Sequence, residues 1–95
     1  MPAELSGPVL DHLYNVGQEQ GMKNFHKSLG INSTEKGRIA GPLTMQKLSE
    51  IPINQALENF ISAAIDHYDK IVENNPDQKV YYNGWINRVN NYRNF

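Results

Sequence analysis

The feature that most constrains the fold is an apolar stripe at helical spacing between residues 54 and 74. Its members recur three and four positions apart, which is the period of one face of an α-helix. A stripe this wide buries against several neighbours, so we expect this segment to be the central helix of an all-α domain. Asn54 is the expected N-cap, and Pro76 closes the far end. The stripe consists of Ile53, Leu57, Phe60, Ile61, Ala64, Tyr68, Ile71 and Val72.

Proline and glycine divide the rest of the chain into further helical segments. Pro8 suits the first position of a helix, where its missing N–H would have no partner, and Gly17 ends that segment. Gly30 stands where a left-handed C-cap belongs, after a second segment that Gly21 weakens. We therefore expect a compact all-α bundle of about five helices. The further segments are 8–16, 18–29, a short helix between Pro42 and Pro52, and 78–93.

Chain length indicates a single domain that spans residues 1–95, in which residues 1–7 are expected to be a flexible N-terminal segment. Residues 32–38 are rich in turn formers and are expected to be a loop. Two of the shorter helices carry apolar stripes that should face the core. The inward residues are Val9, Leu10, Leu13 and Tyr14 in the first helix, and Met45 and Leu48 in the third.

The charge of the chain excludes some classes of partner. Nine basic residues balance ten acidic ones, without a run of like charge, so neither nucleic acid nor an anionic membrane surface is expected. No segment approaches the length of a membrane span, and no secretory signal precedes the first helix. We therefore expect a chain made in the cytoplasm. The absence of cysteine excludes disulfides and thiolate metal sites.

A cluster near the C-terminus points to function. In the sequence Tyr82-Asn83-Gly84-Trp85-Ile86-Asn87-Arg88, the only tryptophan lies beside a glycine, amides and an arginine. On a helix, Trp85 and Arg88 share a side, and Gly84 lets another backbone come close. Two interpretations stay open. The aromatic residues are plain core, or Tyr82, Asn87 and Arg88 line a groove for a polar, ring-shaped ligand such as a sugar.

Candidates for direct chemistry are few. Asp66, Asp69 and Glu73 follow one another along the polar face of the long helix, where they point the same way and share the same solvent. Glycoside hydrolysis instead needs two carboxylates that flank a bond in different environments. Asp66 and Lys70 are better read as a surface ion pair. The histidines are far apart in the sequence and lack a metal-binding spacing. No catalytic residue, metal ligand or cofactor is assigned.

Three short motifs follow one another in a recognisable order. They are Asn15-x-Gly17, Gly41-Pro42-x-Thr44 and Gly84-Trp85-x-x-Arg88. With the helices between them, they resemble the predicted peptidoglycan-binding C-terminal domain of phage-type N-acetylmuramidases, a group that includes endolysins and secretion activators. The resemblance covers residues 8–93. It implies a bacterial or bacteriophage protein, half of a lysozyme-like fold, and action at the periplasm or cell wall.

The chain departs from this family in two places. Its loop carries Lys36 where the family has aspartate, and three residues instead of two separate Gly37 from Gly41. The muramidases also carry a catalytic Glu-Gly-Gly motif, and no glutamate here is followed by two glycines. The resemblance thus implies a chain that is not an enzyme on its own. It would be a free-standing wall-binding module, a subunit that completes a separate catalytic half, or a fragment of a longer enzyme.

The residue types suggest how such a module would bind the glycan or the stem peptide of peptidoglycan. Aromatic rings stack on the flat faces of sugars, amides pair with N-acetyl and hydroxyl groups, and Arg88 can hold a stem-peptide carboxylate bidentately. The alternative is a structural or interaction protein that forms a homo-oligomer or docks on a partner. The candidate ligand-binding residues are Tyr14, Asn15, Tyr82, Trp85, Asn87 and Arg88.

Overall fold

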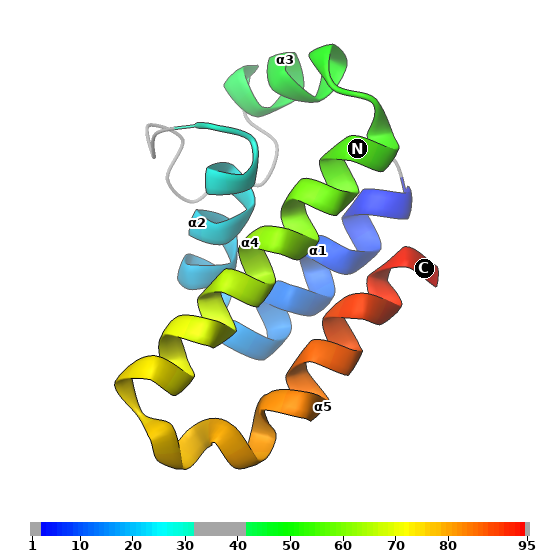
Figure 1. Cartoon of the computed structure of the whole chain (residues 1–95). Coiled ribbons are helices and arrows are strands. Elements are labelled where there is room, and N and C mark those ends of the chain that lie inside the picture. Colours follow the sequence, from blue (N-terminus) through cyan, green and yellow to red (C-terminus); the bar gives the residue numbers. More distant parts are fainter. Residues whose placement is uncertain (1–2, 32–41, 95) are drawn as a thin grey trace.

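The computed structural model describes residues 3–31 and 42–94, and these form an all-α fold, as the sequence predicts (Figure 1). No strand occurs in these two ranges, and none of their helices is long and apolar enough to cross a membrane. The expected loop at 32–38 and the Gly41 of the second motif lie outside them. The helices are α1 (Ala3–Val16), α2 (Gln18–Ser28), α3 (Pro42–Glu50), α4 (Ile53–Asn74) and α5 (Lys79–Asn90), with short 3₁₀ helices η1 (Pro76–Gln78) and η2 (Asn91–Asn94).

Helix α4 is the centre of the domain, as its wide apolar stripe predicts. It contacts α1, α2 and α5, and α5 returns antiparallel along it after η1 (Figure 1). Its N-cap is Pro52 and not Asn54. The carbonyl of Pro52 accepts the first helical hydrogen bond from the N–H of Ala56 at 3.0 Å, so the helix begins before Asn54.

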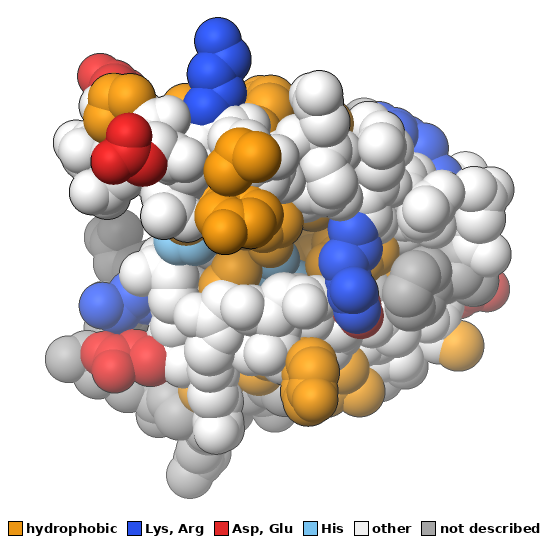
Figure 2. Space-filling model, turned by 90° about the horizontal axis from the view of Figure 1, so that it is seen from below, with side chains coloured by type: hydrophobic (Ala, Val, Ile, Leu, Met, Phe, Trp, Pro, Cys, Tyr) orange, Lys and Arg blue, Asp and Glu red, His pale blue; other side chains and the backbone are white. Residues whose placement is uncertain are grey.

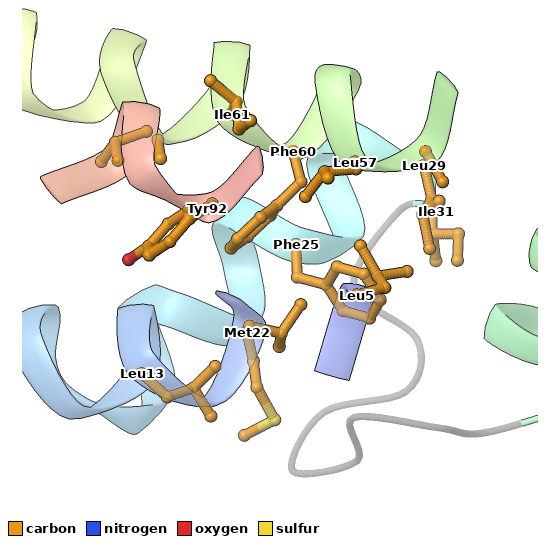
Figure 3. Close-up of a cluster of buried hydrophobic side chains, with 14 of the residues drawn as sticks. Leu5, Leu13, Met22, Phe25, Leu29, Ile31, Leu57, Phe60, Ile61 and Tyr92 are labelled. Carbon is orange, nitrogen blue, oxygen red and sulfur yellow. The ribbon is translucent and has the colours of Figure 1, made fainter. Parts of the chain in front are cut away.

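Aromatic rings from several elements meet in the core (Figure 3). Phe25 of α2 meets Phe60 of α4 edge to face, with 5.8 Å between ring centroids. Tyr92 of η2 stacks on Phe60 at 6.1 Å. Leu5 and Val9 from the start of α1 are fully buried in the same cluster. The two ends of the described chain therefore pack into one core with α2 and α4.

Helices α1 and α2 form a tight corner that depends on glycine. Gly17 separates them with a φ of 93°, and Gly30 ends α2 with a φ of 74°, as predicted for a left-handed cap. Inside α2, a Cβ atom added to Gly21 would lie 2.9 Å from the Cα and the Cγ of Leu13. Gly21 thus lets α2 cross α1 at close range, which explains a residue that the sequence alone marks only as a weak point.

The start of α1 differs from the sequence prediction. The helix begins at Ala3 and contains Pro8, so residues 3–7, expected to be a flexible N-terminal segment, form the first turns of α1 instead. Leu5 and Val9 lie one turn apart and are both fully buried. Burial of these two side chains against the core stabilises the turn ahead of Pro8 and outweighs the hydrogen bond that proline cannot donate.

Three residues predicted to face inward are exposed instead. Leu10, Tyr14 and Met45 expose 57%, 88% and 46% of their surface. In α1 the buried stripe runs through His12 and Leu13, and this leaves Tyr14 one position further round the helix, on the solvent side. The sequence-based assignment had counted Tyr14 in the apolar stripe of this helix.

Candidate ligand-binding cleft

A cleft of about 730 Å³ lies between the corner of α1 and α2, the C-terminal half of α4, and α5. Figure 2 looks into this end of the bundle, where hydrophobic and histidine side chains form the floor of a hollow with a mostly uncharged rim. The volume falls within the range of small-molecule sites. Residues that line the cleft include Asn15, Gln20, His67, Tyr68, Gly84, Trp85 and Arg88.

Trp85 links the cleft to the core. Its indole stacks on the ring of Tyr68 with 4.8 Å between centroids and 20° between planes. Tyr68 is only 4% exposed, whereas Trp85 is partly buried and lines the cleft. Tyr81 lies tilted against the indole at 6.0 Å but is itself 57% exposed. Trp85 therefore packs on the core through Tyr68 and also borders the cleft.

Arg88 lines the cleft and is held by Asp11 of α1. Its Nε and Nη2 donate to the two carboxylate oxygens of Asp11 at 3.0 and 2.7 Å, and Tyr92 donates to the same carboxylate at 2.9 Å. We call these three residues the Asp11 clasp. The hydrogen bond from Arg88 is the main reason that the pKa of Asp11 is lowered. The fork that the sequence assigned to a stem-peptide carboxylate is thus already occupied.

Beneath the cleft lies a hydrogen-bonded chain of side chains that sequence reasoning missed. Nε2 of the fully buried His12 is 2.9 Å from Nδ2 of Asn24, and the amide of Gln20 donates to Oδ1 of Asn24 at 3.0 Å. Because Oδ1 of Asn24 accepts from Gln20, Nδ2 of Asn24 is the donor to His12. The same hydrogen bond fixes the orientation of the Gln20 side chain, which lines the cleft. Burial lowers the pKa of His12 to about 4, so its ring is neutral at pH 7. His12 follows the buried Val9 at helical spacing, and this spacing was the signal in the sequence that could have shown His12 to be buried.

The cleft carries little net charge. His67 lines it, and burial and the neighbouring Lys70 lower the pKa of this histidine, which keeps the ring largely neutral at pH 7. The guanidinium of Arg88 is balanced by Asp11 at 2.7 Å. Among the described residues that line the cleft, no other side chain is ionised at this pH. The site is therefore suited to an uncharged polar ligand.

The structure brings together half of the predicted ligand residues. Those that line the cleft are Asn15, Trp85 and Arg88. Tyr14 is 88% exposed and outside the lining. Tyr82 packs on the core and donates its hydroxyl to the carboxylate of Asp69 on α4. Asn87 is exposed and lies two positions from Trp85, which places it on a different side of α5.

Asp66 of α4 is engaged in ion pairs at the surface. Asp66 pairs with Lys70 at 3.1 Å, as predicted, and with Lys27 of α2 at 3.4 Å. All of these side chains are more than half exposed, so the pairs contribute little to stability. In the part of the chain that the structure describes, no group of three histidine, aspartate or glutamate residues is placed to hold a metal ion.

Comparison with protein-family models, curated proteins and solved structures finds no match to this chain. The resemblance to muramidase domains therefore stays a prediction from the order of its motifs.

Proposed function

We propose that this chain binds the glycan of bacterial peptidoglycan in the cleft, without cleaving it. The observation that carries the proposal is the presence of one indole, two side-chain amides and a guanidinium around a single cleft of about 730 Å³. These groups belong to Trp85, Asn15, Gln20 and Arg88.

The chemistry of these groups matches a sugar chain. A pyranose ring has a flat, weakly apolar face that packs on aromatic rings such as that of Trp85. Its hydroxyl and N-acetyl groups need both donors and acceptors, and the amide oxygens of Asn15 and Gln20 can accept. The amide nitrogen of Asn15 already donates to Asp11, so the amide donor that remains is the second N–H of Gln20, whose first is given to Asn24. The near-neutral lining fits an uncharged glycan better than an anionic one. The motif order supports peptidoglycan over other glycans and, with it, a proposed site of action at the periplasm or cell wall.

Binding without hydrolysis is supported by the state of the acidic side chains. A general acid for glycoside cleavage needs a carboxyl pKa raised by burial. The pKa values of Asp11, Glu58 and Asp66 are instead lowered, each mainly by a hydrogen bond from a cationic partner. Turbidity of purified walls should therefore stay constant with this chain alone. Clearing that appears only with a separately supplied catalytic half would favour the subunit role.

The test is sedimentation with insoluble peptidoglycan sacculi. The parent chain should sediment, and Asn15→Ala and Gln20→Ala should weaken binding while the helical circular-dichroism signal is kept. Asn87→Ala serves as the control, because that amide is exposed on α5 outside the cleft lining. A parent chain that stays in the supernatant would exclude the proposed function.

A second candidate function is that of an interaction protein. It is favoured by apolar side chains on the outside of α1 and α5, where Leu10, Tyr14, Val80 and Tyr81 are 57%, 88%, 77% and 57% exposed. Sedimentation equilibrium of the parent chain measures self-association directly. A stable oligomer that does not bind sacculi, and that Tyr14→Ser with Val80→Ser dissociates, would favour this role.

A further inference from the structure

Gly84 is a helix-interior glycine that nothing within the described molecule requires. It lies in the middle of α5 and borders the cleft. A Cβ atom added there would meet no atom of the packed neighbours within 4 Å. The residue is not among the described glycines with positive φ. Glycine at such a position costs about 1 kcal/mol relative to alanine, so the fold alone would favour alanine.

Other glycines of the domain have a reason inside the molecule. Gly17 and Gly30 adopt positive φ angles, and Gly21 is fitted against Leu13. The sequence predicts that Gly84 lets another backbone come close. Among the described residues no backbone does so, because nothing lies within 4 Å of a Cβ atom added there. Gly84 is one of the residues that line the cleft.

We infer that Gly84 is a ligand-contact position, at which the face of an uncharged sugar ring packs directly on the backbone of α5 beside Trp85. The inference rests on the proposed function and deepens it by naming the point of closest approach. Gly84 and Arg88 are one turn apart on the same side of α5. A ring over Gly84 therefore has the indole beside it and the guanidinium at the next turn.

The free edge of Arg88 suits this placement. Its Nε and Nη2 are held by Asp11, and Nη1 has no hydrogen-bond partner among the described residues. Nη1 can donate to a hydroxyl or carbonyl oxygen of a ligand without breaking the clasp. Because the charge of Arg88 is already balanced, recognition by this edge does not depend on a charged ligand. Binding should then change little between about 0.05 and about 0.5 M salt.

The experiment compares Gly84→Ala with the parent chain and with Asn83→Ala, a neighbouring exposed position outside the cleft lining. Two probes are used: insoluble sacculi, and a soluble oligomer of β-linked N-acetylglucosamine followed by the emission of Trp85, the only tryptophan. Gly84→Ala should raise Tm by roughly 3–6 °C. It should also weaken binding of both probes at least about tenfold, since the added methyl group occupies the contact point. Asn83→Ala should leave binding unchanged.

Each other outcome is decisive. If the parent binds sacculi and Gly84→Ala binds equally well, the inference is overturned while the proposed function stands. If Gly84→Ala lowers Tm, the glycine serves the fold and the inference is also overturned. Binding that falls tenfold with added salt would contradict the uncharged ligand. A parent chain that binds neither probe removes the proposed function and this inference together.

Discussion

Gly21 in α2 and Gly84 in α5 both interrupt the interior of a helix, yet only Gly21 is fitted against another element. A Cβ atom at Gly21 would press on Leu13 at 2.9 Å, whereas one at Gly84 would meet nothing within 4 Å. The two residues look alike in the sequence. The difference teaches that the fold requires an interior glycine when a neighbour occupies the space that a Cβ atom would need. When that space is open, the fold does not require the glycine.

The same contrast separates the elements that carry these glycines. Helix α2 buries five of its residues, including Met22 and Phe25, whereas α5 buries only Val89. Besides partly buried aromatic contacts, α5 is attached through hydrogen bonds at its surface, from Arg88 to Asp11 and from Tyr82 to Asp69. We therefore expect substitutions in the α1–α2 corner to change stability, and substitutions on the cleft side of α5 to change binding.

The largest effect should come from deleting a buried ring. Phe25 is fully buried in α2 against Phe60, so Phe25→Ala should cost about 3–5 kcal/mol of unfolding free energy. Trp85→Ala should cost less, about 2 kcal/mol, because the indole is only partly buried. Urea unfolding measures both. Equal losses would mean that α5 is part of the core as much as α2, and would break the comparison.

Lowering the pH should lower the free energy of unfolding, because His12 is buried next to the α1–α2 corner. The pKa of this buried ring is lowered from 6.5 to about 4. Between these two pH values the unfolded chain binds a proton at His12 and the folded chain does not. Stability is therefore full above pH 6.5 and falls as the pH drops toward 4, by up to about 3 kcal/mol. His67 adds a smaller effect of the same sign.

The matched variant for this pH effect is His12→Leu. It leaves the amide of Asn24 without its partner, which lowers stability at every pH, but it cannot take up a proton. The difference in unfolding free energy between parent and variant should therefore shrink from pH 7 to pH 4. A constant difference would show that His12 is not the group that titrates.

The two interior glycines should respond to alanine with opposite signs. Gly21→Ala forces Leu13 and the α1 backbone to move, which should cost about 1–3 kcal/mol. Gly84→Ala should instead stabilise the chain, by roughly 0.5–1 kcal/mol. Thermal unfolding of the two variants in parallel measures this directly. The same sign for both would remove the distinction between the two glycines.

The smallest stability effect is expected at the two bidentate arginine pairs. Arg88 binds Asp11 and Arg93 binds Glu58, and both arginine side chains are about half exposed, at 53% and 45%. Alanine at either arginine should change the unfolding free energy little, because solvent screens both pairs. Only Arg88 borders the cleft, so Arg88→Ala should weaken sacculus binding while Arg93→Ala does not. Collapse of the fold in Arg88→Ala would make that residue purely structural.

Much of the fold follows from local sequence signals. The period of the apolar stripe predicts α4, and Gly17, Gly30 and Pro52 mark real helix boundaries because backbone conformation there depends on the residue itself. The start of α1 could not be placed in this way. Leu5 extends the helix ahead of Pro8 only because the assembled core covers it.

The cleft could be predicted only in part. Trp85 and Arg88 are found together because they are neighbours on one helix, and Asn15 enters through its motif. Asp11 could not be assigned as the partner of Arg88, since the pair joins residues 77 positions apart. Tyr14 and Asn87 were placed by residue type, and residue type does not say which side of a helix meets the cleft.

The Asp11 clasp also sets the order in which the domain can be completed during synthesis. Asp11 and Arg88 are 77 residues apart, so at roughly 5–20 residues per second about 4–15 s pass between their translation. Helices α1 and α2 adjoin in the chain and can pack within that interval, because closing a short loop loses little entropy. Until α5 leaves the ribosome, the ring of Tyr68 lacks the indole that stacks on it. The side of the cleft that carries Trp85 is thus built late, after the helices that it packs against.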